Sequence, residues 1–145
     1  MINLDPYMTT KLNAECYLIK KGVRSCAFIT ITFDINDTQE EIDEFLYHLE
    51  QDALQFNCRT YWKKMELDEE YGDDRPSYSF WIYRYDHQLP LIKVILNSPA
   101  KTYITEWMTG KLLGYSDADM EEYLSRQVLM SIDLEENLKS LNKKD

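Results

Sequence analysis

The sequence predicts an α+β fold, in which an antiparallel sheet of four to five strands carries three to four helices packed mainly on one face. Two observations support this class. Stretches in which apolar residues recur at every second position alternate along the chain with stretches in which they recur at helical spacing. Their order suits helices lying against an antiparallel sheet. The length of 145 residues and the 44% hydrophobic content suffice for one core. We therefore expect residues 1–145 to form a single compact domain.

The first element permits two interpretations. Asp5 and Pro6 are typical of a helix start, with an aspartate cap and a proline in the first turn. The alternative is a strand over residues 15–20 that turns at Gly22 into its neighbour. We favour a short helix followed by a hairpin. The residues that would share one face of this helix are Met8, Leu12, Cys16 and Ile19.

Residues 24–34 show the clearest strand pattern in the chain, because a run rich in β-branched residues alternates between two faces. The two faces carry Ala27, Ile29, Ile31 and Phe33 on one side and Cys26, Phe28, Thr30 and Thr32 on the other.

The next element is a helix over about residues 38–55. Thr38 and Glu41 have the spacing of a capping box, in which each side chain bonds the backbone of the other residue. The apolar residues that continue at helical spacing are Ile42, Phe45, Leu46, Leu49, Ala53 and Phe56.

Three antiparallel strands are expected after this helix. Aromatic residues dominate the first two, over residues 58–67 and 77–86, which flank an acidic stretch at 68–76 that contains glycine. The third strand, over residues 91–97, follows a short turn at 87–90.

Two helices complete the prediction. Ser98 and Pro99 again form a cap followed by a proline, and an apolar stripe then ends before Gly114. Ser116 caps the last helix with Asp119 three residues on, and this helix either continues towards Leu141 or ends near Ser131. The two stripes consist of Ile104, Trp107, Met108, Lys111 and Leu112, and of Met120, Tyr123, Leu124 and Val128.

Charge and cysteine content limit the class of function. The chain has 16 basic and 26 acidic residues, a net charge of −10, which repels nucleic acids and anionic membranes and favours basic partners. The chain has an odd number of cysteines without a repeated spacing, which argues against a disulfide framework. We therefore interpret Cys16, Cys26 and Cys58 as small core residues in a reducing compartment. Because no signal peptide or membrane span is evident, we expect a cytoplasmic protein.

The sequence predicts no catalytic residue, metal site or cofactor. Only two histidines, His48 and His87, are present, and the common metal and nucleophile motifs are missing. Residues 109–114 superficially resemble a phosphate loop, but the upstream glycine is lacking and leucine follows Lys111 where serine or threonine is needed.

The candidate functional feature is an acidic stretch from Asp34 to Asp52, which holds eight carboxylates and no lysine or arginine. Like-charged pairs three or four residues apart on a helix repel one another, so this pattern is mildly unfavourable for folding. Either it keeps the protein soluble or a basic partner neutralises it. One row on the helical wheel consists of Asp37, Glu41, Glu44, His48 and Asp52, and the next of Glu40, Asp43, Tyr47 and Glu50.

A second acidic cluster, from Glu66 to Asp74, adds six carboxylates without a basic residue. The acids at the start of the last helix are explained locally, since a helix N-terminus favours negative charge. We therefore expect the partner-binding residues to be Asp37, Glu40, Glu41, Asp43, Glu44, Tyr47, Glu50, Asp52, Asp68, Glu69, Glu70, Asp73 and Asp74.

The aromatic strand at 77–86 carries large side chains on both faces. Trp81, Tyr83 and Tyr85 share one face, which is either core or an exposed patch that anchors an interface. The opposite face carries Tyr78, Phe80, Ile82 and Arg84.

These features favour a non-catalytic interaction protein that docks on a basic surface of a partner, such as a nuclease or another nucleic-acid-binding protein. Small acidic inhibitors that imitate nucleic acids, including phage anti-defence proteins, and toxin-neutralising immunity proteins act in this way. The comparison is one of charge and size alone. Oligomeric state is not predicted.

The alternative is a small enzyme or ligand-binding protein with a cleft between the aromatic strands and the C-terminal helices. Trp81, Tyr83, Tyr85 and Trp107 would line this cleft, and Glu106 would act as a base. The two hypotheses predict different shapes, a convex acidic ridge and a deep pocket.

Overall fold

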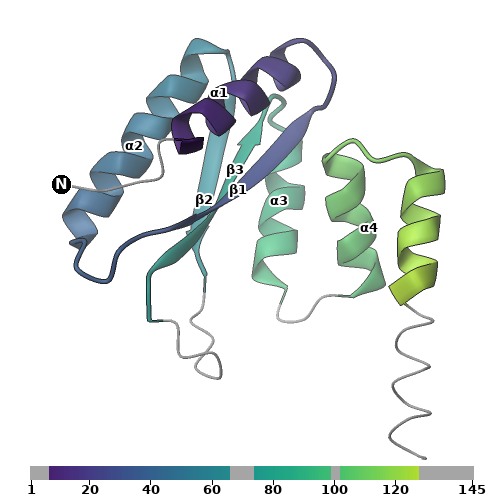
Figure 1. Ribbon diagram of the computed structural model, residues 1–145. Coiled ribbons are helices and arrows are strands. Elements are labelled where there is room, and N and C mark those ends of the chain that lie inside the picture. Colours follow the sequence, from purple (N-terminus) through teal and green to yellow (C-terminus); the bar gives the residue numbers. More distant parts are fainter. Residues whose placement is uncertain (1–6, 66–73, 99–101, 128–145) are drawn as a thin grey trace, which may run out of the picture.

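The computed structural model describes residues 7–65, 74–98 and 102–127, which form five helices and a three-stranded sheet (Figure 1). A final helix covers residues 117–127. The elements before it are α1 (Tyr7–Lys20), β1 (Cys26–Thr32), α2 (Gln39–Gln55), β2 (Arg59–Lys64), β3 (Ser77–Tyr83), α3 (Gln88–Asn97) and α4 (Tyr103–Leu112).

The sheet is antiparallel with strand order β1-β3-β2, so β3 lies in the middle. Phe28 of β1, Trp81 of β3 and Tyr61 of β2 stand opposite one another, as do Ile29, Phe80 and Trp62 on the other face. The α+β class is therefore confirmed. The predicted four to five strands are wrong for the described residues, which contain three strands, and so are the predicted three to four helices, since these residues contain five.

Residues 91–97, which were predicted as a strand, belong to the helix α3. Leu89, Ile92, Ile95 and Leu96 follow helical spacing and pack against the sheet, whereas Val94 is half exposed. Pro90 fits the first turn of a helix, where the backbone N–H has no intrahelical partner. A short apolar run rich in isoleucine and valine does not by itself distinguish a strand from a buried helix.

The helices cover both faces of the sheet, contrary to the prediction that they pack mainly on one. α1 and α2 lie on one face, and α3 lies on the other with α4 and helix 117–127 beside it (Figure 1). The larger cluster joins α1 and α2 to Ile29, Ile31, Phe80 and Ile82. The smaller cluster lies under α3 and consists of Cys26, Trp81, Tyr83, Ile92 and Leu112.

The first element is a helix, as favoured, and the alternative strand over residues 15–20 is wrong. The helix ends where Gly22 adopts a φ of +77° and the N–H of Val23 bonds the carbonyl oxygen of Leu18 at 3.0 Å. The expected hairpin is not formed, because β1 pairs with the distant β3.

Two of the three predicted caps after the first helix are confirmed. Thr38 and Glu41 form a capping box, and Ser116 accepts a hydrogen bond from the N–H of Asp119. The third is wrong, since Ser98 ends α3 and Thr102 caps α4. Ile104 of the predicted stripe is 73% exposed. Pro99, Val128, Ser131 and Leu141 lie outside the described residues.

Gln88 is a buried polar residue whose amide joins three segments. Its Oε1 accepts hydrogen bonds from the N–H groups of Arg84, at 3.1 Å, and Tyr85, at 2.9 Å. Its Nε2 donates to the carbonyl oxygen of Ser25 at 3.2 Å. These bonds hold the start of α3 against the end of β3 and the beginning of β1.

We predict that Gln88→Ala lowers the free energy of unfolding by about 2–3 kcal/mol, because a buried side-chain amide is removed and three partly buried backbone groups lose their partners. Urea denaturation measures the change. Gln51→Ala, on the exposed side of α2, is the control and should stay within about 0.5 kcal/mol of the unsubstituted protein. Equal denaturation midpoints for the two variants would contradict the role assigned to Gln88.

The three cysteines are buried and form no disulfide, as expected for core residues. Burial raises the pKa of the Cys26 thiol from 9.0 to about 12, against a smaller lowering by a hydrogen bond from the Ala27 backbone. The unfolded chain thus releases this proton at lower pH than the folded chain does. The stability that depends on Cys26 is therefore complete below pH 9 and is lost as the pH rises towards 12.

We predict that the free energy of unfolding falls more steeply above pH 9 in the unsubstituted protein than in Cys26→Ala. The difference in slope is at most about 1.4 kcal/mol per pH unit, the value for one proton. Urea denaturation at pH 8, 9 and 10 measures both slopes. Parallel slopes would show that Cys26 is not a buried thiol in the folded protein.

Candidate functional site

The exposed carboxylates of α2 lie on the side of the helix that faces away from the sheet. The side of α2 that packs on the sheet is apolar and carries Ile42, Leu46, Leu49 and Ala53. Of the predicted partner-binding residues in this region, Glu40, Asp43, Glu44 and Tyr47 are exposed, whereas Asp37, Glu41, Glu50 and Asp52 are half-buried. We call these eight residues the acidic face.

Three carboxylates of the acidic face have structural partners. Asp37 accepts a hydrogen bond from the N–H of Asp34 at 2.9 Å, and Glu41 belongs to the capping box. Asp43 accepts a hydrogen bond from the side-chain amide of Gln39 at 2.8 Å. These bonds explain part of the acidic composition by local structure.

The other carboxylates lack a neutralising lysine or arginine. Glu44 lies 3.8 Å from Nε2 of His48, and both side chains are largely exposed. Within the described ranges, neither Glu40, Glu44, Glu50 nor Asp52 pairs with a lysine or arginine. The lysine and arginine side chains that form ion pairs in the described structure pair with other carboxylates. These pairs are Glu15–Arg24, Asp86–Arg59, Asp117–Lys111 and Glu122–Arg126. No lysine or arginine of the described residues therefore neutralises these four carboxylates.

The second predicted acidic cluster falls mostly on residues whose structure is not described. Asp74 is exposed, at the beginning of the segment that leads into β3. Asp68, Glu69, Glu70 and Asp73 lie outside the described residues, so their part in the binding surface stays a prediction.

The predicted aromatic face does not form an exposed patch. Trp81 and Tyr83 are 2% and 5% exposed and belong to the smaller cluster under α3. Tyr85, beyond the end of β3, is 47% exposed and stacks on His87 with ring centroids 5.6 Å apart. Of the three residues, only Tyr85 is available to a partner at the surface.

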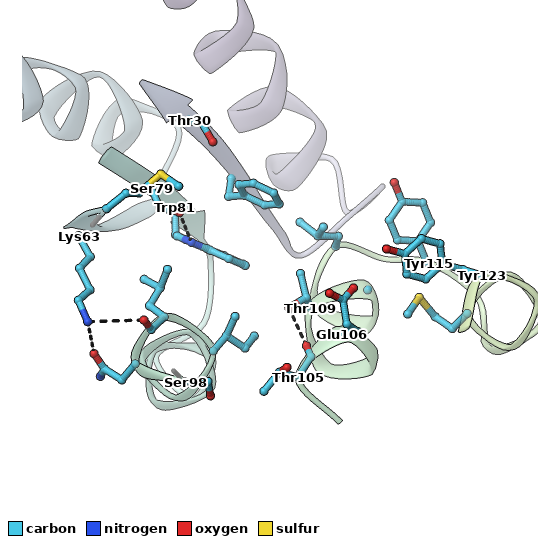
Figure 2. A pocket seen from close by; sticks show the side chains of 18 of the residues that line it. Thr30, Lys63, Ser79, Trp81, Ser98, Thr105, Glu106, Thr109, Tyr115 and Tyr123 are labelled. Atoms are coloured by element: carbon cyan, nitrogen blue, oxygen red, sulfur yellow. Dashed lines mark hydrogen bonds between the residues drawn. The ribbon is translucent and has the colours of Figure 1, made fainter. Parts of the chain in front are cut away.

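A cleft of about 1040 Å³ lies between the sheet and the C-terminal helices (Figure 2). The face of the sheet that α3 leaves partly open contributes Phe28, Ser79 and Trp81. Phe28 and Trp81 stack with ring centroids 5.0 Å apart, and Nε1 of Trp81 donates a hydrogen bond to Oγ of Ser79 at 2.9 Å. The sheet thus provides an aromatic wall in which the indole N–H is already paired.

The two ends of the cleft differ in charge. At the β2 end, Nζ of Lys63 donates to Oδ1 of Asn97 at 2.5 Å, and Lys64 is nearby. The opposite end, between α4 and helix 117–127, carries Glu106 and Asp119 together with Tyr115, Tyr123 and Met120. Figure 2 shows Lys63 and the two tyrosines on opposite sides of the cleft.

Glu106 and Tyr123 interact across this acidic end. The pKa of Tyr123 is raised, chiefly by the negative charge of Glu106 and further by burial and a hydrogen bond to that carboxylate. Helix 117–127 approaches α4 closely at Gly110, where a Cβ atom would overlap the side chain of Met120. Gly110 therefore permits the contact that closes this end.

The alternative hypothesis anticipated the position of the cleft better than its lining. Trp81 and Glu106 line it, whereas Tyr83, Tyr85 and Trp107 do not. Sequence reasoning missed Phe28, Tyr115 and Tyr123. Phe28 could have been found from the alternation of the strand at 24–34, which places it on the less apolar face.

Comparisons with protein-family models, with curated proteins and with solved structures yielded no match to this chain. Among the described helices none has the length and apolar character needed to cross a bilayer. Nor do the described residues gather three or more histidine, cysteine or carboxylate side chains in an arrangement that could hold a metal ion.

We predict that Glu44→Lys stabilises the protein by about 0.5–1 kcal/mol at low salt. The side chain at position 44 lies at helical spacing from Glu40 and Glu41, and it would then attract these two carboxylates instead of repelling them. Urea denaturation at low salt and in 1 M NaCl measures the gain, which salt should reduce. An equal gain in both buffers, or none, would show that the charges of α2 do not repel one another measurably.

Proposed function

We propose that this protein is a non-catalytic interaction protein that docks the acidic face on a basic surface of a partner protein. The observation that supports this proposal is that four carboxylates of α2 have no lysine or arginine partner in the described structure, namely Glu40, Glu44, Glu50 and Asp52. A partner that supplies these cations would relieve the repulsion within α2 and gain favourable Coulomb energy.

The partner class follows from this charge. Successive carboxylates in a helical row are about 5–6 Å apart, so the row can meet several lysine and arginine side chains at once. Basic surfaces of this kind are typical of proteins that bind nucleic-acid phosphates. Occupation of such a surface would exclude the nucleic acid, so we propose inhibition of a nuclease or another nucleic-acid-binding protein. The three unbonded cysteines suit a cytoplasmic setting.

The experiment is affinity capture with the tagged full chain, followed by mass spectrometry and binding measurements on the captured partner. We predict that Glu40→Gln combined with Glu44→Gln weakens binding about tenfold at low salt, as expected for the loss of two exposed ion pairs. The unsubstituted protein should also lose affinity as salt is raised, because screening weakens the same pairs.

The matched control is Glu121→Gln combined with Glu122→Gln, which removes the same net charge from exposed positions on helix 117–127. This control should keep most of the affinity. Equal binding by the α2 variant and the unsubstituted protein would refute docking through α2. Equal losses in both variants would show that net charge matters and its position does not.

A second candidate function is the binding of a small ligand in the cleft. The observation that favours it is the cleft itself, whose volume is at the upper end of the range of ligand sites and whose lining combines aromatic and aliphatic walls with a few charged groups. The cleft and α2 lie on opposite faces of the sheet, so the two functions do not compete for one surface.

A further inference from the structure

We propose that the ligand of this cleft is an organic cation with an extended apolar body, which places its charged group between Glu106 and Asp119. The inference rests on the second candidate function, small-ligand binding in the cleft, and names the class of ligand. Both carboxylates line the same cleft, and the rings of Tyr115 and Tyr123 line it with them. Carboxylates and aromatic rings together are the groups that attract alkylammonium ions.

The acidic end is suited to a cation for two reasons. Glu106 is only half-buried, so its carboxylate stays within reach of a ligand as well as of Tyr123. The residues Tyr115 and Tyr123 are 55% and 44% exposed, which leaves side-chain surface available for cation–π contact. Lys111 lies beside this end, where its Nζ donates a hydrogen bond to the carbonyl oxygen of Tyr115 at 3.1 Å. Its charge is balanced by the carboxylate of Asp117, with which it forms an ion pair.

The apolar body has a continuous surface on which to lie. Leu113 and Met120 line the cleft near the acidic end, and the stacked pair of Phe28 and Trp81 continues the lining on the sheet. Lys63 and Lys64 at the far end repel a cation. The charges at the two ends therefore favour one orientation, with the cationic group towards helix 117–127.

Isothermal titration calorimetry on the full chain compares three ligands of equal alkyl chain length. These are decyltrimethylammonium, decanoate and 1-decanol. The two ionic ligands are used below their micelle concentrations and the alcohol below its solubility limit. We expect decyltrimethylammonium to bind with one site per chain and about tenfold more tightly than decanol, the ratio for about 1.4 kcal/mol. Decanoate should bind no more tightly than decanol.

Variants locate the charged group. Glu106→Gln should weaken decyltrimethylammonium binding about tenfold and leave decanol binding unchanged. Asp119→Asn should act in the same direction, which keeps the test valid if one variant folds poorly. Glu121→Gln, on the same helix but outside the cleft lining, is the matched control and should have no effect.

The possible failures are distinguishable. If decanol and decyltrimethylammonium bind equally, the preference for a cation is refuted and ligand binding in the cleft stands. If none of the three binds, both the preference for a cation and the binding of a ligand with an apolar body in the cleft are refuted. Docking through α2 is not affected by this result. If the Glu40→Gln and Glu44→Gln double variant loses decyltrimethylammonium binding while Glu106→Gln retains it, the cation lies on α2 and the assignment to the cleft is wrong.

Discussion

Burial of β3 on both faces is the constraint on which the rest of the structure depends. Phe80 and Ile82 point into the core under α1 and α2, whereas Trp81 and Tyr83 point towards α3. A strand with large apolar groups on both sides requires cover on both sides. The chain meets this requirement by placing its first two helices on one face and α3 on the other. The hydrogen bonds of Gln88 then fix α3 against the strand ends.

This arrangement separates two surfaces of different chemistry. α2 uses its apolar side to cover the sheet, so Glu40, Asp43 and Glu44 face solvent on the opposite side. On the other face, α3 covers the part of the sheet near Tyr83 and leaves Phe28 partly open, and α4 with helix 117–127 encloses the remaining space as a cleft. One surface is acidic and exposed, and the other is a largely apolar cleft.

The sequence predicted the elements whose signals are local. The alternation around Ile29 and the capping box of Thr38 depend on neighbouring residues, and both were located correctly. Residues 91–97, expected as a third strand after a short turn, form a helix instead, and only packing against Trp81 and Tyr83 decides between the two for such an apolar run. The positions of the carboxylates on α2 can be predicted from helical spacing in the sequence. The cleft is lined by residues far apart in the chain, such as Phe28 and Tyr123, so it depends on tertiary contacts that sequence spacing does not show.

The most direct test of docking through α2 is carbodiimide cross-linking of the tagged chain to its captured partner, because this reagent joins carboxylates to lysines that already touch them. Mass spectrometry then identifies the joined residues. We predict cross-links from Glu40, Asp43 and Glu44 to lysines of the partner. Cross-links confined to Glu121 and Glu122, with none from α2, would contradict the central claim that the acidic face is the binding surface.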